Sequence, residues 1–209
     1  MARPRLISDA QILDATRKAV FDEGAHVSLD VIADSLGVSQ PALLKRFGTR
    51  KDLMLAALRP PEVPTFTAQV DAGPDDRPLG VQLGEVFNVV CAYFEEHAPR
   101  LTALRESGIP ICDIFPKNTL PTPLRTTKTL QGWLQRAQAR QLVGPVDVET
   151  TAFAIMSTFI AHSHMKHMLK RAPIRGSQRA FLESITEFFT RALAPTTPAA
   201  RSKPLRSAS

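Results

Sequence analysis

The chain has 209 residues, of which 44% are hydrophobic and 22% are charged, close to the averages of folded globular proteins. This length allows one large domain or two small ones with a buried core, and the composition excludes a wholly disordered or fibrous protein. The net charge of +6, from 26 basic and 20 acidic residues, permits an anionic partner without identifying one.

The first 58 residues predict four short helices, each preceded by a serine or a threonine. These residues are preferred N-caps because their side-chain oxygen accepts a hydrogen bond from a free N–H of the first helical turn. The first expected helix follows Ser8 and Asp9 and runs to about residue 23, and the others cover residues 29–36, 40–47 and a segment that starts at residue 50. Their caps are Ser8, Ser28, Ser39 and Thr49.

The second and third of these segments form a helix-turn-helix unit. Ala33 is small enough to let two helices cross closely, and Gly37 can adopt the turn conformation that a Cβ disfavours. Leu43 supplies the apolar contact that holds the second helix on the first. The segment from Gln40 to Lys51 carries four basic residues and no acidic one. This positive face predicts contact with a nucleic-acid phosphate backbone.

Prolines separate this N-terminal unit from the rest of the chain. Five of the 17 prolines fall within residues 60–78, where they disfavour a regular helix because proline lacks an N–H donor. The composition of the last 15 residues is typical of a disordered basic tail. We therefore expect three parts: residues 1–58, 59–194 and 195–209.

The region between these limits has a helical hydrophobic pattern throughout. Apolar residues recur at spacings of three and four over residues 79–97, 122–142, 147–170 and 177–193, and no alternating strand pattern is evident. The sequence therefore predicts an all-α protein.

No segment has the features of a membrane span or an export signal. The longest run without a charged residue covers residues 150–165, whereas a transmembrane helix needs about 20 mostly apolar residues. The basic N-terminus lacks the apolar core of a secretory signal. The two cysteines, Cys91 and Cys112, lie in apolar segments, which favours free thiols in a reducing compartment. We expect a cytoplasmic protein without a membrane partner.

Motifs for catalysis or metal binding are missing from the sequence. The GxSxG, HExxH, P-loop and GxGxxG spacings do not occur. Three histidines, His162, His164 and His167, lie close together, and the last two share a helix face, a spacing compatible with metal binding. Cys91 or Cys112 could complete such a site, but no acidic residue is near the histidines in sequence, so we expect no metal. Because the catalytic and cofactor motifs are missing, we also expect no cofactor and no enzyme activity.

In its first part the sequence resembles the TetR family of bacterial transcriptional regulators. Two positions depart from the family pattern: Leu44 replaces an aromatic residue, often tyrosine, and the usual phenylalanine late in the first helix falls at Val20, with Phe21 one step on. The resemblance covers residues 8–58. It rests on Ile12-Leu13-Asp14-Ala15, Gly24, Ser28-Leu29, Ile32-Ala33, Leu36-Gly37-Val38-Ser39, Leu43, Phe47 and Thr49-Arg50-Lys51-Asp52-Leu53.

The resemblance implies that the helix over residues 40–47 enters the major groove of operator DNA. Gln40 could form a bidentate pair with adenine, whereas Pro41 and Ala42 offer only apolar contact. Arg3 and Arg5 could reach a minor groove as a flexible arm. The N-termini of the expected helices that begin at residues 29 and 50 would help to bind phosphates. The further candidates for contact with DNA are Ser28, Ser39, Lys45, Arg46, Thr49 and Lys51. The ordinary alternative is that these are helix caps and solvated charges.

The resemblance also implies a homodimer that binds a palindromic operator, because one N-terminal helix-turn-helix unit contacts too few base pairs for useful specificity. Residues 147–170 and 177–193 are apolar on two sides, more than packing inside one chain requires. They would pair with their mates as a four-helix bundle, with Ile185, Phe188 and Phe189 as members; an internal core is the alternative.

The middle helices would then form a helical ligand-binding domain that encloses a cavity for a small effector. The aromatic residues and the small number of charges there predict an apolar or aromatic effector. Effector binding would favour a form whose recognition helices no longer match the groove spacing, which releases the operator. The candidate lining residues, each of which could equally be plain core, are Phe87, Cys91, Phe94, Leu104, Ile109, Phe115, Trp133, Phe159 and His162.

Two other functions remain open. The chain could be a DNA-binding regulator without a small effector, controlled by a protein partner or acting constitutively. It could also be an enzyme that uses histidine and cysteine, although no motif supports this.

Overall fold

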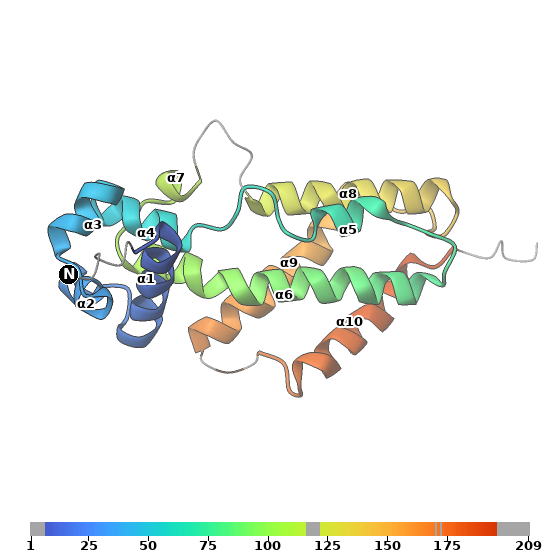
Figure 1. Ribbon diagram of the computed structural model, residues 1–209. Helices are drawn as coiled ribbons and strands as arrows, with labels where there is room; N and C mark the ends of the chain where they lie inside the picture. Colours follow the sequence, from blue (N-terminus) through green and yellow to red (C-terminus); the bar gives the residue numbers. More distant parts are fainter. Residues whose placement is uncertain (1–6, 116–121, 170, 172, 196–209) are drawn as a thin grey trace, which may run out of the picture.

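A computed structural model describes residues 7–115, 122–169, 171 and 173–195. Over these residues the protein is built from helices and contains no strand (Figure 1), so the predicted all-α class is confirmed. The helices are α1 (Asp9–Glu23), α2 (Leu29–Leu36), α3 (Gln40–Phe47), α4 (Arg50–Leu58), α5 (Thr67–Ala72), α6 (Leu79–Glu106), α7 (Ile111–Ile114), α8 (Thr122–Ala139), α9 (Val148–Leu169) and α10 (Gln178–Leu193).

Helices α1 to α4 form a head at one end of an elongated molecule (Figure 1). The predicted caps begin three of them: Ser8, Ser28 and Thr49 each accept a hydrogen bond from an N–H of the following turn. Ser39 precedes α3 but makes no such bond. Local sequence therefore sets where each head helix starts, as the cap pattern predicted.

The turn between α2 and α3 has the helix-turn-helix geometry. Gly37 adopts a left-handed conformation with φ of 66°, which a residue with a Cβ adopts only at a cost. Ile32, Ala33 and Leu43 are each 1% exposed, so α2 and α3 are locked together through these side chains. This packing fixes which side of α3 faces outward.

The other helices form a body organised around α6. α6 packs against α9 and α10, and α8 packs against α9 and α5 (Figure 1). The core contains Phe87, which meets Phe159 and Phe189 edge-to-face at ring-centroid distances of 5.2 and 5.8 Å. Aromatic rings favour this arrangement because the positive edge of one ring meets the negative face of another.

The structure extends α6 beyond the predicted end at residue 97. Pro99 lies inside the helix, which continues to Glu106. Proline removes one helical hydrogen bond and is costly in a helix interior, but Ala98, Ala103 and Leu104 around it are buried. Their burial keeps this stretch helical. The predicted irregular connection over residues 60–78 likewise contains α5.

The last turns of α6 and the short helix α7 pack into the core of the head. Ala103, Leu104, Ile109 and Ile114 belong to the same buried cluster as the side chains of α1 to α4. The division near residue 59 stays a prediction, but packing crosses it. The predicted tail lies outside the described residues, apart from Pro195.

Two features of the whole chain complete the description. No helix in the described ranges is long and apolar enough to cross a membrane. Cys91 is buried and Cys112 is exposed, and both are free thiols.

Candidate nucleic-acid interface

Helix α3 exposes the residues that were predicted to face the bases. Pro41 and Ala42 are exposed and Gln40 is half-buried, whereas Leu43 is buried on the opposite side. Proline fits the first turn of a helix because the N–H of this position has no helical partner. At the N-terminal end of α3, the exposed side chains are therefore small and uncharged.

The predicted phosphate-binding cations differ in their surroundings. Lys45 is exposed and has no ion-pair partner among the described residues. Arg46 is paired with Asp9 and also donates a hydrogen bond to the carbonyl of Ile7. The side chain of Arg46 thus ties α3 to the start of α1 and is less free for a phosphate than predicted.

Lys51 is held by an acidic residue from outside the helix-turn-helix. Its Nζ lies 2.7 Å from Oδ2 of Asp113 in α7, and this hydrogen bond raises the pKa of Lys51 above its usual value. Lys51 therefore stays charged, but a carboxylate already lies beside it.

The structure gives Arg50 a role within the fold. Its Nη2 donates to the carbonyls of Ala25 and Val27 at 2.8 and 3.1 Å, and these two residues lie in the turn that joins α1 to α2. Arg50 was counted among the positive charges of the predicted DNA face. It instead holds α4 against this turn by satisfying backbone acceptors that would otherwise be unpaired.

The remaining candidates serve as helix caps or lie outside the described residues. Ser28 accepts from the Val31 N–H at 3.3 Å, and Thr49 both accepts from the Asp52 N–H and donates to the Asp52 carboxylate. These bonds hold the pKa of Asp52 below its usual value. Arg3 and Arg5 are not among the described residues.

We expect Lys45→Ala to weaken binding to all DNA duplexes alike. The side chain is exposed, so its loss leaves the free energy of unfolding unchanged within about 0.5 kcal/mol. One lost phosphate contact lowers the slope of log K against log salt by about one unit per head. A fluorescence titration over several salt concentrations measures this slope. Lys18→Ala, which removes an equal charge from α1, is the control, and an unchanged slope for Lys45→Ala would exclude the contact.

Six of the nine predicted effector-lining residues share one buried region of the body. Phe87, Cys91, Phe94, Trp133 and Phe159 all belong to the same core cluster. His162 joins them by stacking on Phe181, with ring centroids 3.9 Å apart and ring planes within 8°. The structure thus places these six residues in one region. Their role as a binding surface stays a prediction.

The other three predicted lining residues lie elsewhere. Leu104, Ile109 and Phe115 pack with the side chains of the head, because α6 passes out of the body and into the head beyond Pro99. They do not line one cavity with Phe87 and its neighbours. The prediction of one lining set therefore fits six of the nine residues, and these three pack in the core of the head instead.

Burial suppresses the reactivity of the cysteine in the body core. Burial raises the pKa of the Cys91 thiol to about 11, and a protonated thiol is a poor nucleophile. Burial also lowers the pKa of His162, although Glu95 lies 3.7 Å from its Nδ1. Among the described residues, no group of three or more His, Cys, Asp or Glu could hold a metal ion.

Tyr93 and His97 form a buried polar pair that the sequence analysis did not single out. Their side chains are 5% and 4% exposed, and their rings lie 4.3 Å apart. Among the described residues, the Tyr93 hydroxyl and both His97 nitrogens have no hydrogen-bond partner, and the Glu96 carboxylate lies 3.8 Å from Nδ1 of His97. Burial raises the pKa of Tyr93 and lowers that of His97. Their spacing of four on the buried face of α6, after Val86 and Val90, was the available signal.

We expect His97 to make the protein less stable below about pH 6.5. Because burial lowers its pKa from 6.5 in the folded state, the unfolded chain binds more protons just below that pH. Stability is therefore present above pH 6.5 and is lost as the pH falls, by at most about 1.4 kcal/mol per pH unit for one proton. In urea unfolding from pH 7 to pH 5, His97→Phe should show a weaker decline than the wild type. His26→Gln, at an exposed position, should decline like the wild type; an equal decline in His97→Phe would contradict this.

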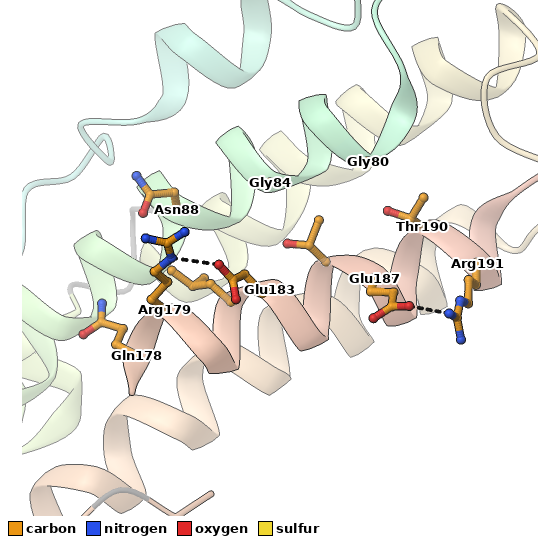
Figure 2. A pocket seen from close by; sticks show the side chains of 11 residues that line it. Gly80, Gly84, Asn88, Gln178, Arg179, Glu183, Glu187, Thr190 and Arg191 are labelled. Carbon is orange, nitrogen blue, oxygen red and sulfur yellow. Dashed lines mark hydrogen bonds and ion pairs between the residues drawn. The ribbon is translucent and has the colours of Figure 1, made fainter. Parts of the chain in front are cut away.

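A groove of about 990 Å³ lies between α6 and α10 (Figure 2). Gly80 and Gly84 form its α6 side, and Thr190 faces Gly80 closely enough that a Cβ there would lie 3.3 Å from its hydroxyl. The charged residues along α10 are paired with each other, as Figure 2 shows for Arg179 and Glu183. The nine predicted effector-lining residues are not among those that line this groove.

The comparisons with known proteins agree with the geometry of the head. Residues 12–57 match the family model described as bacterial regulatory proteins, tetR family, and these residues span the helix-turn-helix and most of α4. The proteins that this family model describes are regulators, and the match therefore favours a regulatory protein over an enzyme. No curated protein sequence matches the chain significantly.

Solved structures of TetR regulators share the fold of nearly the whole chain. A TetR transcription regulator from Haloarcula marismortui is 17% identical with a TM-score of 0.68, covering 88% of this chain and 97% of that one. The regulator SCO0520 from Streptomyces coelicolor is 22% identical with a TM-score of 0.57, covering 91% and 100%. PfmR from Thermus thermophilus is 21% identical with a TM-score of 0.57, covering 87% and 95%. The predicted resemblance to the TetR family is thereby confirmed.

Proposed function

We propose that this chain, a DNA-binding transcriptional regulator with a TetR-family head, is a dimeric repressor that a small effector releases from a palindromic operator. The observation that carries the proposal is the outward surface of α3. Pro41 and Ala42 are exposed there, beside the unpaired Lys45, while Leu43 holds the helix rigidly from behind. Small residues allow close approach to base edges, and a free cation beside them suits a phosphate.

The last two helices support a homodimer. Phe153 on α9 and Phe188 on α10 are 63% and 62% exposed, and Met165 and Met168 add further exposed apolar surface to α9. Large apolar side chains that a single chain leaves exposed are enriched at interfaces. A two-fold dimer through α9 and α10 would bury them and would present two α3 helices to half-sites about one helical turn apart.

Among the interface candidates, Phe189 lies inside the protomer. It is 8% exposed and packs on Phe87, whereas Phe188 points outward and Ile185 is half-buried. The proposed interface therefore uses Phe188 and the outer part of Ile185, and Phe189 belongs to the core.

The body core supports effector control. It combines the aromatic side chains of Phe87, Phe94 and Phe159 with polar atoms of Tyr93 and His97 that have no hydrogen-bond partner among the described residues. Buried polar atoms without hydrogen bonds lower the stability of the folded protein. A ligand that forms hydrogen bonds with these atoms would therefore bind favourably. We propose an aromatic or apolar effector that carries at least one polar group. Its binding would act on the cytoplasmic protein by shifting the population of head positions.

Sequence-selective DNA binding tests the proposal. The full-length protein would be incubated with a pool of random duplexes at low salt, and bound duplexes would be enriched and sequenced. We expect a palindrome with half-sites about one helical turn apart and an affinity that falls steeply with salt. A protein that enriches no motif, or that binds no duplex at low salt, would refute the proposal.

A regulator controlled by a protein partner is the alternative. A small effector that occupies the core would raise the melting temperature and lower the operator affinity together, since it stabilises one form at the expense of the other. A thermal-shift screen of aromatic acids and alcohols, followed by operator titration with each stabilising compound, separates the two. Stabilisation without loss of DNA affinity favours the alternative.

A further inference from the structure

A carboxylate from outside the helix-turn-helix lies on the predicted DNA-binding face. Asp113, in α7, places its Oδ2 2.7 Å from Nζ of Lys51 in the first turn of α4. The two side chains are 34% and 48% exposed. The ion pair is therefore open to solvent and within reach of an external anion.

The backbone of α7 is fixed to the head independently of this ion pair. Arg59, at the other end of α4, donates from Nη2 to the carbonyl of Asp113 at 2.7 Å. The next residue, Ile114, is 1% exposed and belongs to the buried cluster of the head. Asp113 is thus held beside α4 by its own main chain and by its neighbour, so its carboxylate would remain near Lys51 when the ion pair opens.

We propose that Asp113 is an intramolecular competitor of DNA phosphate for Lys51. A phosphate that approaches Lys51 must displace this carboxylate or share the cation with it. In either case a negative charge remains close to the phosphate and repels it. Asp113 therefore lowers the affinity of the head for DNA of any sequence. The inference rests on the proposed function, because it requires Lys51 to lie at the DNA surface.

Asp113→Asn tests the competition directly, because asparagine keeps the size of the side chain and removes its charge. In fluorescence titrations with operator and with random duplex, we expect the variant to bind both about three- to tenfold more tightly than the wild type. The slope of log K against log salt should steepen by up to about one unit per head, since one more phosphate contact forms. If the Asp113→Asn substitution only loosened the packing of α4, DNA binding would become weaker instead.

A double-mutant cycle assigns the effect to Lys51. Lys51→Gln should weaken binding and reduce the salt slope, and Asp113→Asn should then add no affinity in the Lys51→Gln background. Asp76→Asn is the matched control for net charge, because Asp76 is 99% exposed and pairs with Arg140. Asp76 belongs to the segment between α5 and α6, which lies at the end of the molecule away from the head (Figure 1). Asp76→Asn should change the operator affinity by less than about twofold.

The outcomes separate the inference from the proposed function. If the wild type binds duplexes but Asp113→Asn binds them equally or more weakly, the competition is overturned and the proposed function stands. An equal gain of affinity in Asp76→Asn, or a full gain in the Lys51→Gln background, also overturns it. If neither wild type nor Asp113→Asn binds any duplex at low salt, both the proposed function and the inference fail.

Discussion

Ala42→Glu is expected to abolish operator binding while leaving the protein folded. Ala42 is exposed in the first turn of α3, where a glutamate is favoured by the helix dipole and by its own helix propensity. In the major groove the same side chain would clash with base edges and place a carboxylate near phosphates. At about 1–3 kcal/mol per head, two heads lose about 30-fold or more in affinity.

Two measurements separate this loss from unfolding. The melting temperature of Ala42→Glu should equal that of the wild type within a few degrees, whereas the operator titration should show no specific complex. Ala139→Glu carries the same change at an exposed position at the end of α8, away from the head (Figure 1), and should bind like the wild type. Retained operator affinity in Ala42→Glu would remove α3 from the DNA interface.

Phe188→Glu is expected to convert the dimer into a monomer. Phe188 is 62% exposed in the protomer, so its replacement removes little packing within the chain. Burial of a phenylalanine contributes about 1.5–3 kcal/mol, and a two-fold interface contains it twice. The loss of both, together with the buried carboxylates, should raise the dimer dissociation constant about a thousandfold or more.

Sedimentation velocity over a range of protein concentrations measures this change. The operator affinity should fall with it, because a monomer contacts only one half-site. Val81→Glu is the matched control: Val81 is 49% exposed on α6, outside the proposed interface, and this variant should sediment like the wild type. A Phe188→Glu protein that remains dimeric would place the interface elsewhere.

The head could be predicted almost completely from local sequence. The caps at Ser28 and Thr49, the glycine at 37 and the apolar spacing through Leu43 act over a few residues, so their meaning does not depend on the rest of the chain. The helix starts and the helix-turn-helix followed directly from them. The same signals carried the family resemblance, which the family model confirmed.

Charges and site membership were predicted less well because both depend on contacts between distant segments. Four basic residues and no acidic one between Gln40 and Lys51 indicated a positive face, but Arg46 meets Asp9 and Lys51 meets Asp113 only after folding. Leu104 and Phe87 share a helix and a hydrophobic pattern, yet they lie in different cores. Periodicity reports that a residue is buried, and it does not report which neighbour covers it.

The amino-acid sequence alone therefore determined the helical class, the helix-turn-helix and the residues that α3 exposes, because these follow from backbone preferences and from the period of one helix. The tertiary structure alone decided which cations are paired and where α6 leaves the body for the head. It also decided that, among the described residues, the buried Tyr93 hydroxyl and His97 nitrogens have no hydrogen-bond partner. Those properties arise from pairings between segments tens of residues apart, for which a single sequence contains no local signal.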